Sequence, residues 1–288
     1  MTSGRALLKA ILPPLVLTCR RRILDGWAHR HRPERVRQLE REHLARNEGL
    51  AGDEICIRDG ITLKIHPESR YAFDYFCFVS PPMVDEMDGF LRLAAGRSRL
   101  LDIGALHGIF ALVFTKTSQD RSAVAVDASP RAFARLLYNI HKNPDCRITP
   151  VECALTEKAG VLPMAYEGRH AVVAALDPRD ASAGPVKADT GDALCETSGF
   201  APDVIKIDVE GHEVKVLRGL AGVLARHRPL IFLELHPGRI RKENESLLPV
   251  IELMKRNRYG ARLPDGSRCE LESLTQIHDD VRLVLTGD

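Results

Sequence analysis

The sequence lacks a long hydrophobic run that could cross a membrane. The apolar segment from Leu7 to Leu17 is too short to span a bilayer, and Pro13-Pro14 interrupt it. Arg20-Arg21-Arg22 follow it without a small-residue cleavage site, which makes the segment a poor signal peptide. We therefore expect a cytoplasmic protein, with a peripheral amphipathic anchor at the N-terminal end as the open alternative.

Paired cysteines are also absent. The seven cysteines are scattered and odd in number, and none belongs to a Cys-x-x-Cys pair. This pattern argues against a disulfide framework and a structural zinc site, and it is typical of proteins from reducing compartments.

The chain has no internal repeat or low-complexity run and little net charge, +2 at pH 7. That charge is uneven, because residues 1–50 contain 11 Lys and Arg against 5 Asp and Glu. We expect a basic helical arm at 1–50, a lead-in or lid segment at 51–98 and the main domain at 99–288. The arm is either a contact for anionic lipid or polyanion, or a solvated helical face.

From residue 99 onward, apolar strands alternate with amphipathic helices. Strands are expected at 99–103, 123–127, 148–153, 204–209 and 230–235, with a terminal pair near 261–263 and 281–285. Such alternation predicts an α/β fold with a mostly parallel sheet covered by helices on both faces. Before it we expect a hairpin at 54–57 and 61–65 and a helix from 81 to 93. The aromatic stretch 71–78 either covers a pocket or packs over the sheet edge.

The stretch Leu100–Gly108 is the one around which the rest is organised. It predicts a buried strand containing Asp102, a tight turn at Gly104 and a helix that starts near Gly108. Glycines in such a turn let the backbone and the helix N-terminus approach a ligand closely. The acid at the strand end favours a cationic or hydroxyl-bearing ligand over a pyrophosphate.

Acidic side chains follow several of the expected strands. Because ligands of open α/β sheets bind at the carboxyl ends of the strands, these acids should share one rim. A dinucleotide would need Gly-x-Gly-x-x-Gly, which is missing here, whereas S-adenosylmethionine offers an ammonium and a ribose diol to acids. Asp127 could hold the ribose in either case. The acids and their neighbouring histidine are Asp102, Asp127, Asp208, Glu210, Glu234 and His236.

Several motifs together resemble the FkbM family of methyltransferases. The most specific is Ile-Lys-Ile-Asp-Val-Glu-Gly-His-Glu at 205–213, and the others lie at 101–108, 126–130, 152–160, 216–219 and 232–236. The resemblance implies methyl transfer from S-adenosylmethionine, usually to a hydroxyl oxygen. It also implies the class I Rossmann-like fold, with a seven-stranded sheet and an antiparallel last pair. Leu106 stands where the family usually has Asn, and Asp127-Ala128 where Glu-Pro is common.

The resemblance also implies roles for individual residues. The loop with Asp102, Gly104, Ala105 and Gly108 would cradle the amino-acid end of the cofactor. Further along the chain, Asp127 and Ala128 would bind the ribose, and Ala154 and Leu155 would lie beside the adenine. The rim that carries the chemistry would consist of Lys206, Asp208, Glu210, Glu234 and His236.

Within this rim, the proton acceptor is expected to be His236, because the unperturbed pKa of histidine lies near working pH. Glu210 or Asp208 could serve instead, and a hydrogen-bonded core histidine is the rival interpretation of His236. Lys206 lies in an apolar strand, so an acid such as Asp208 should pair with it, either for catalysis or as a structural ion pair. A cation held by acids of this rim is conceivable, but no recognisable metal spacing is present and we expect no metal.

The expected partner is a small hydroxylated acceptor such as a sugar or a glycolipid headgroup, in a pocket built by residues 60–95 and 157–192. A nucleic-acid substrate is not expected, because the core is net acidic and has no Asn-Pro-Pro-aromatic motif. The alternatives are a non-catalytic module of the same fold and a nicotinamide-dependent oxidoreductase. The sequence carries no signal for the oligomeric state.

Overall fold

A computed structural model gives the structure of the chain and describes residues 33–58, 60–167, 170–173 and 184–287. Of the expected basic arm at 1–50, the described part contains the helix α3 (Pro33–Asn47), and the apolar segment Leu7–Leu17 lies outside the described residues. Among the helices that the structure describes, none is both long and apolar enough to span a membrane.

A central sheet of eight strands forms the middle layer, in the order β13-β12-β14-β11-β10-β3-β4-β5. The five strands from β11 to β5 are parallel, whereas β14 runs antiparallel to β11 and β12 antiparallel to β14. The expected mostly parallel α/β fold is therefore confirmed, with one strand more than seven because the two-residue β13 folds back on β12. The strands are β3 (Arg99–Ile103), β4 (Ser122–Asp127), β5 (Ile148–Glu152), β10 (Val204–Ile207), β11 (Leu230–Leu235), β12 (Tyr259–Arg262), β13 (Arg268–Cys269) and β14 (Val281–Gly287).

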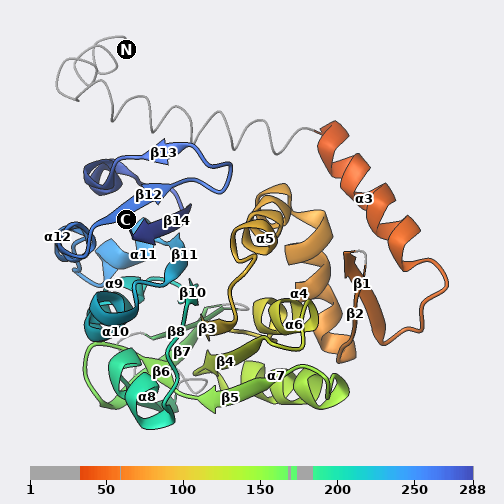
Figure 1. Cartoon of the computed structure of the whole chain (residues 1–288), viewed down its shortest axis with the longest axis horizontal. Helices are drawn as coiled ribbons and strands as arrows, with labels where there is room; N and C mark the ends of the chain where they lie inside the picture. Colours follow the sequence, from red (N-terminus) through yellow and green to blue (C-terminus); the bar gives the residue numbers. More distant parts are fainter. Residues whose placement is uncertain (1–32, 59, 168–169, 174–183, 288) are drawn as a thin grey trace.

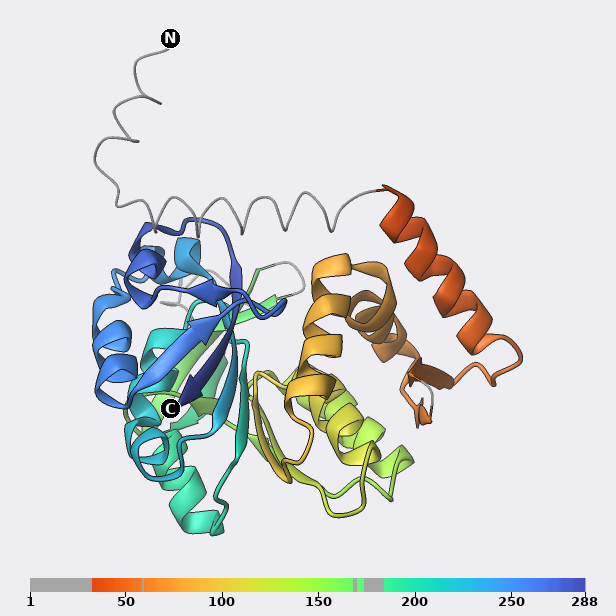
Figure 2. The ribbon, with the colours of Figure 1, turned by 45° about the horizontal axis from the view of Figure 1, so that its top comes forward.

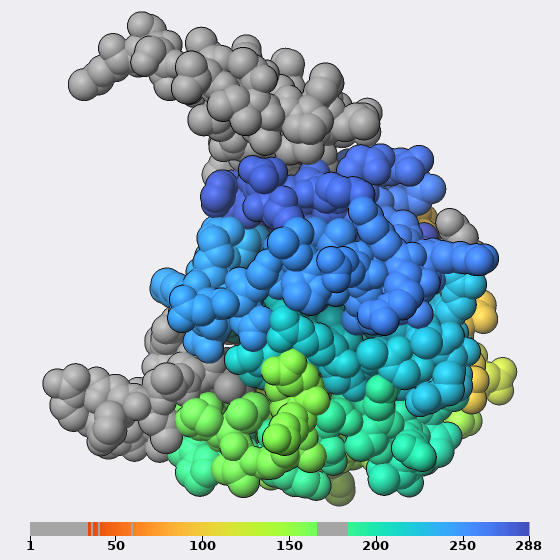
Figure 3. All heavy atoms as spheres, turned by 90° about the vertical axis from the view of Figure 1, so that its left-hand side faces the viewer, coloured from red at the N-terminus to blue at the C-terminus, as the bar shows by residue number. Residues whose placement is uncertain are grey.

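Helices cover both faces of this sheet (Figure 1). One face packs against α5 (Pro81–Leu93), α6 (Ile109–Lys116) and α7 (Pro130–Lys142). The other packs against the helices after residue 190, and Figure 3 shows their continuous outer surface beside the C-terminal segment. These are α8 (Gly191–Ser198), α9 (Glu213–Gly219), α10 (Ala221–His227), α11 (Pro237–Lys242) and α12 (Leu248–Arg256).

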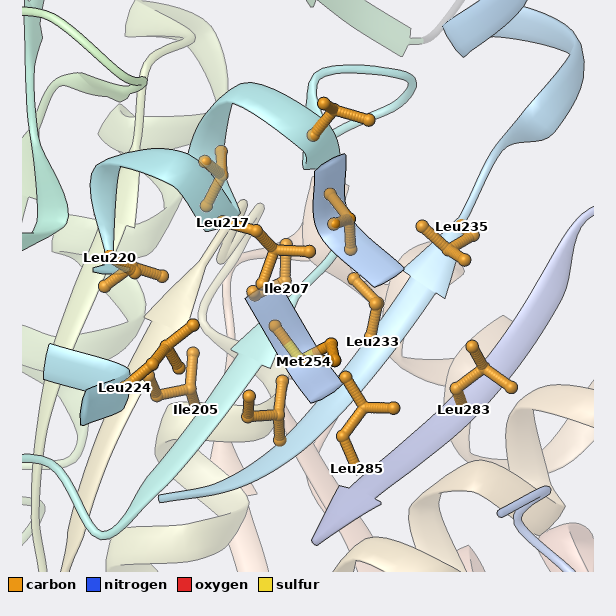
Figure 4. Close-up of a cluster of buried hydrophobic side chains, with 14 of the residues drawn as sticks. Ile205, Ile207, Leu217, Leu220, Leu224, Leu233, Leu235, Met254, Leu283 and Leu285 are labelled. Atoms are coloured by element: carbon orange, nitrogen blue, oxygen red, sulfur yellow. The ribbon is translucent and has the colours of Figure 1, made fainter. Parts of the chain in front are cut away.

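Side chains along β10 alternate between the two faces of the sheet, so the strand contributes to the hydrophobic core on each face. Ile205 and Ile207 point to the α9–α12 side, where they pack with Leu217, Leu233 and Met254 (Figure 4). Since neighbouring residues of a strand face opposite sides, the residues between them face the α5–α6 side. One of these is a lysine, the only charged residue of the strand.

The connections differ from the sequence expectation in two places. The helix expected between the strands at 204–209 and 230–235 is broken into α9 and α10, and α11 was not expected. A second sheet, β6-β9-β7-β8, lies between β5 and α8 in the chain. The end of α9 contacts this sheet, because a Cβ at Gly219 would lie 2.0 Å from the carbonyl oxygen of Thr156. Its strands are β6 (Ala154–Leu155), β7 (Gly160–Glu167), β8 (His170–Val173) and β9 (Gly184–Asp189).

The segment before β3 packs onto the α6 face of the sheet (Figure 2). It contains the expected hairpin, β1 (Glu54–Arg58) and β2 (Ile61–Lys64), which is confirmed, and three short helical turns. The aromatic stretch is helical, so it buries Phe73 and Phe78 and leaves Tyr71 63% exposed. The helical turns are η1 (Pro67–Ser69), α4 (Arg70–Asp74) and η2 (Tyr75–Val79), and a further turn, η3 (Leu271–Gln276), precedes β14.

A cavity of about 130 Å³ lies between α3, β1 and α5 and is lined in part by Leu39, Arg58 and Asp88. Ligand pockets commonly measure about 300–1,000 Å³. The cavity is therefore too small for a nucleoside, and the residues that line it are not those of the expected rim.

Candidate functional site

The carboxyl ends of β3, β4, β10 and β11 lie side by side at one edge of the sheet. Asp102 in β3 is in register with Lys206 in β10, and the amide of Asp208 donates to the carbonyl of Ile103 at 3.0 Å. Asp127 ends β4, and Glu234 lies near the end of β11. The edge thus brings together acids that are more than a hundred residues apart in the sequence.

The turn after β3 is shaped by contacts within the protein. Gly104 has a φ of +76°, and a Cβ at this position would lie 1.8 Å from the carbonyl oxygen of Asp208. Gly108 has a φ of +83°, and its Cβ would lie 2.6 Å from Leu136. The glycines therefore let the turn pass against β10 and α7, whereas the sequence analysis attributed them to the approach of a ligand.

Substitution of Gly104 by alanine is expected to lower the free energy of unfolding by about 2–4 kcal/mol. The reason is a backbone clash added to a left-handed conformation that L side chains rarely adopt. Gly266→Ala is the matched control, because Gly266 has a φ of +88° with nothing within 4 Å of its Cβ. Urea unfolding should show the larger loss for Gly104→Ala, and equal losses would contradict the close approach to Asp208.

Asp127 closes β4 and organises the turn beside it. Its Oδ2 accepts a hydrogen bond from the amide of Leu106 at 2.7 Å, and its Oδ1 accepts one from the amide of Ser129 at 2.9 Å. Burial raises the pKa of Asp127 to about 6, and the charge of nearby Asp208 adds to this rise. The two hydrogen bonds from backbone amides oppose it. A carboxylate has about four lone-pair positions, so two acceptor positions are left over.

Asp102 lies deeper than expected, with 1% of its surface exposed. It accepts a hydrogen bond from the amide of Ala111 at 3.1 Å, which fixes the first turns of α6. Burial raises the pKa of Asp102 to about 7, and Lys206 opposes part of this rise. Asp102 thus holds the start of α6 next to the turn that is expected to bind the cofactor. Direct contact between Asp102 and a ligand stays a prediction.

The expected adenine neighbours lie at the same edge. Ala154 and Leu155 form β6, which follows β5 directly, and the amide of Cys153 donates to the carbonyl of Asp127 at 3.1 Å. Ala128 follows Asp127 and is half-buried. Their positions are compatible with the roles that the resemblance implies, which stay predictions.

Lys206 is the centre of a buried charge cluster. Its ammonium is 1% exposed and lies 3.1 Å from Glu86, 3.7 Å from Asp208 and 5.1 Å from the ring centre of Phe110. The expected acid beside Lys206 is confirmed, but Glu86 on α5 is closer and was not anticipated. Burial alone would lower the pKa of Lys206, whereas the surrounding carboxylates outweigh it and raise the pKa above its ordinary value.

Arg282 on β14 links this cluster to β11. Its Nε donates to Glu86 at 2.9 Å, and its Nη2 donates to Glu234, with which Arg282 is in register. Burial, with nearby Asp208 adding to it, raises the pKa of Glu234 to about 8. Sequence analysis did not find Arg282, since nothing in a terminal antiparallel strand indicates which carboxylate it will meet.

His236 is held by a buried carboxylate. Its Nδ1 lies 2.7 Å from Oε1 of Glu213, which is 0% exposed and also accepts from the amide of Gly211 at 2.8 Å. Burial disfavours the imidazolium, but the hydrogen bond and the charge of Glu213 outweigh it and raise the pKa of His236 to about 9. A raised pKa favours the protonated imidazole, so it does not support the expected role of His236 as proton acceptor, and that role stays a prediction.

Glu210 is the more accessible acid of the rim. It has a φ of +53°, unusual for a residue with a side chain, and its carboxylate is 22% exposed. Oε2 lies 3.2 Å from Nε of Arg239 and 3.6 Å from Nε2 of His236. Strained backbone of this kind concentrates at functional sites. Glu210 is thus a partly exposed carboxylate held in place by its neighbours.

Comparisons with known proteins identify the family of the chain. The family model described as the methyltransferase FkbM domain matches residues 102–263. Hexuronic acid methyltransferase AglP of Haloferax volcanii is 29% identical over 160 residues, which cover 54% of this chain and 62% of that protein. The chain thus matches less than two thirds of the length of this curated relative.

Solved methyltransferase structures superpose on part of the chain at low sequence identity. The FkbM methyltransferase of Methylobacillus flagellatus superposes with a TM-score of 0.45 and 17% identity, over 66% of this chain and 43% of that one. The precorrin-6y C5,15-methyltransferase of Geobacter metallireducens gives a TM-score of 0.40 and 13% identity, over 70% and 86%.

Proposed function

Because the chain belongs to the FkbM methyltransferase domain family, we propose that it transfers a methyl group from S-adenosylmethionine to a hydroxyl oxygen of a sugar or sugar-bearing lipid. The observation that carries this proposal is the position of Asp127 at the tip of β4, beside the turn at 104–108. The donor supplies a methyl group that a positively charged sulfur has already activated. The protein has to bind the donor, orient the acceptor and remove the acceptor's proton.

The residues at the end of β4 fit a nucleoside without phosphates. Two acceptor positions of Asp127 remain after its hydrogen bonds to the backbone, which is the number that a ribose diol requires. The charged groups that act on Asp127 are the acids Asp208 and Glu152. These carboxylates would repel a pyrophosphate and attract an ammonium or a sulfonium. They thus support S-adenosylmethionine over a nicotinamide dinucleotide as the ligand.

We assign to Glu210 the role of taking up the proton of the acceptor's hydroxyl. Its carboxylate is partly exposed, so it can reach a bound hydroxyl, and Arg239 at 3.2 Å fixes its orientation. Asp208 is the second carboxylate of the rim, 20% exposed. Lys206 and His236 hold its pKa below the ordinary value although burial alone would raise it, so Asp208 is ionised at neutral pH.

A sugar acceptor is supported by the relative from Haloferax volcanii, whose name gives hexuronic acid as its substrate. The segment expected to build the acceptor pocket lies close to the rim on the α6 side. Phe76 of η2 contacts Phe110 edge to face, and Phe110 lies under the ammonium of Lys206. Of the second expected pocket segment, 157–192, residues 168–169 and 174–183 lie outside the described residues.

The affinity for S-adenosylmethionine is expected to fall about tenfold between pH 7 and pH 5. With a pKa of about 6, Asp127 is mostly ionised at pH 7 and mostly protonated at pH 5, where it accepts fewer hydrogen bonds from the ribose. Calorimetric titration at several pH values measures this change.

The substitution Asp127→Asn should weaken binding and remove its dependence on pH. Asp120→Asn is the control, because Asp120 is exposed and lies just before the other end of β4. A pH dependence that survives in Asp127→Asn would remove the ribose assignment. Binding of NADH with higher affinity than S-adenosylmethionine would favour the oxidoreductase alternative instead.

The activity is tested with cell extracts and a panel of sugars in the presence of methyl-labelled S-adenosylmethionine. Mass analysis of the labelled product identifies the acceptor, and methyl transfer to a hydroxyl oxygen of a sugar is expected. Cofactor binding without any labelled product would favour the non-catalytic alternative.

A further inference from the structure

Three side chains of the rim bring potential metal ligands close to one another. Each of Asp208, Glu234 and His236 offers one ligand atom, and these atoms lie within 4.8 Å of one another. We propose that the three residues bind one divalent metal ion, of the class that accepts both carboxylate and imidazole ligands. Neither the family match nor the relatives assign a metal to this chain.

The distances around His236 fit a cation better than direct hydrogen bonds. Its Nε2 lies 3.8 Å from Glu234 and 4.0 Å from Asp208, beyond the reach of a hydrogen bond. Ligand atoms at about 2.1 Å from one metal ion are separated by about 3–4.2 Å in octahedral geometry. Small side-chain movements would therefore bring all three atoms onto one ion.

The imidazole is already oriented for this role. Metal-binding histidines typically donate their second ring N–H to a carboxylate, which fixes the tautomer and the direction of the ligating nitrogen. In this chain Glu213 occupies that position, 2.7 Å from Nδ1 of His236 and 0% exposed. Because Nδ1 contacts Glu213, Nε2 is the nitrogen that faces the acids, and a metal ion bound there would displace the proton from Nε2.

The two carboxyl groups each contact a cation of the surrounding cluster. Arg282 donates a hydrogen bond to Glu234. Lys206 lies 3.7 Å from Oδ2 of Asp208, whereas Oδ1 is the oxygen nearest to His236.

The donor set determines the class of ion. One imidazole and two carboxylates suit Mn²⁺, Fe²⁺ or Zn²⁺, because Ca²⁺ prefers oxygen ligands only. The role of the ion rests on the proposed function: bound next to Glu210, it would coordinate the acceptor's hydroxyl and lower its pKa, so that Glu210 can take the proton.

Binding of Mn²⁺ to the full chain tests the proposal without any methyl acceptor. The protein is treated with EDTA, dialysed and titrated with MnCl₂, and electron paramagnetic resonance follows the free ion. We expect one saturable site, and pulsed measurements on the bound ion should show coupling to a histidine nitrogen. His236→Gln should abolish this coupling and weaken Mn²⁺ binding at least about tenfold. Asp208→Asn should weaken Mn²⁺ binding by a similar factor. Asp279→Asn, which alters an exposed acid outside the rim, should change neither.

The absence of a saturable site, or a bound ion without nitrogen coupling in the unmodified protein, would overturn the proposal even if the variants fail to fold. Failure of this proposal and failure of the proposed function are distinguishable. Methyl transfer at full rate in EDTA would contradict the metal site alone. Tight Mn²⁺ binding with nitrogen coupling supports the metal site, whether or not any acceptor is methylated.

Discussion

Replacement of Glu86 by alanine is expected to lower the free energy of unfolding by about 3–5 kcal/mol, the usual cost of breaking a buried ion pair. The Glu86 side chain is 3% exposed and contacts Lys206 at 3.1 Å and Arg282 at 2.9 Å. Without it, two buried cations share the carboxylates that remain. The charge cluster thus ties α5 to β10 and β14, and its loss should destabilise all three elements together.

Urea unfolding measures the effect, with Asp88→Ala as the control on the same helix. Asp88 also pairs with an arginine, Arg58, but its side chain is 51% exposed, so its loss should cost no more than about 1 kcal/mol. The double variant Glu86→Met/Lys206→Met should recover part of the stability that Glu86→Ala loses, because it leaves one fewer buried cation without its partner. A cost for Glu86→Ala as small as that of the control would contradict the buried cluster.

Replacement of Glu210 by glutamine is expected to lower the rate of methyl transfer about 10²–10⁴-fold, the usual contribution of a proton acceptor. Glutamine keeps the size of the side chain and an oxygen for Arg239, but it cannot take up a proton from a hydroxyl. The affinity for S-adenosylmethionine should stay within about threefold, because Glu210 is not among the residues expected to bind it. Single-turnover rates and calorimetry separate the two effects.

Glu245→Gln is the matched control for this experiment. Glu245 is likewise a partly exposed acid, 3.1 Å from an arginine, Arg218, and it lies outside the rim and the expected pocket segments. Its substitution should leave the transfer rate within about twofold. If Glu210→Gln retained more than a tenth of the rate, the assignment of Glu210 would be wrong, and Asp208 would be the remaining exposed carboxylate.

The sheet was largely predictable because its strands are apolar runs with clear ends. The strands at 99–103 and 230–235 have the expected bounds, since each is buried along most of its length and ends at a turn residue or a proline. The break between α9 and α10 was not predictable. It falls at Leu220, next to Gly219, which lies against Thr156, and nothing in the periodicity of the helix reports that contact.

The site was predictable where it depends on single strands. Asp127 and Asp208 follow strands whose ends had to share an edge, so their proximity to the turn at 104–108 follows from topology. Glu86 and Arg282 come from a covering helix and an antiparallel strand, and only tertiary packing reveals that they meet. The raised pKa of His236 likewise depends on Glu213, which the sequence analysis included only as the last residue of the motif at 205–213.

The central claim is that the acids at the ends of β3, β4 and β10 surround a single sulfonium nucleoside. A crystal structure grown with S-adenosylhomocysteine tests it most directly. The account predicts ribose hydroxyls on the Asp127 carboxylate and the amino-acid end of the ligand over the turn at 104–108. A nucleoside bound elsewhere, with the edge of the sheet filled by side chains, would contradict it.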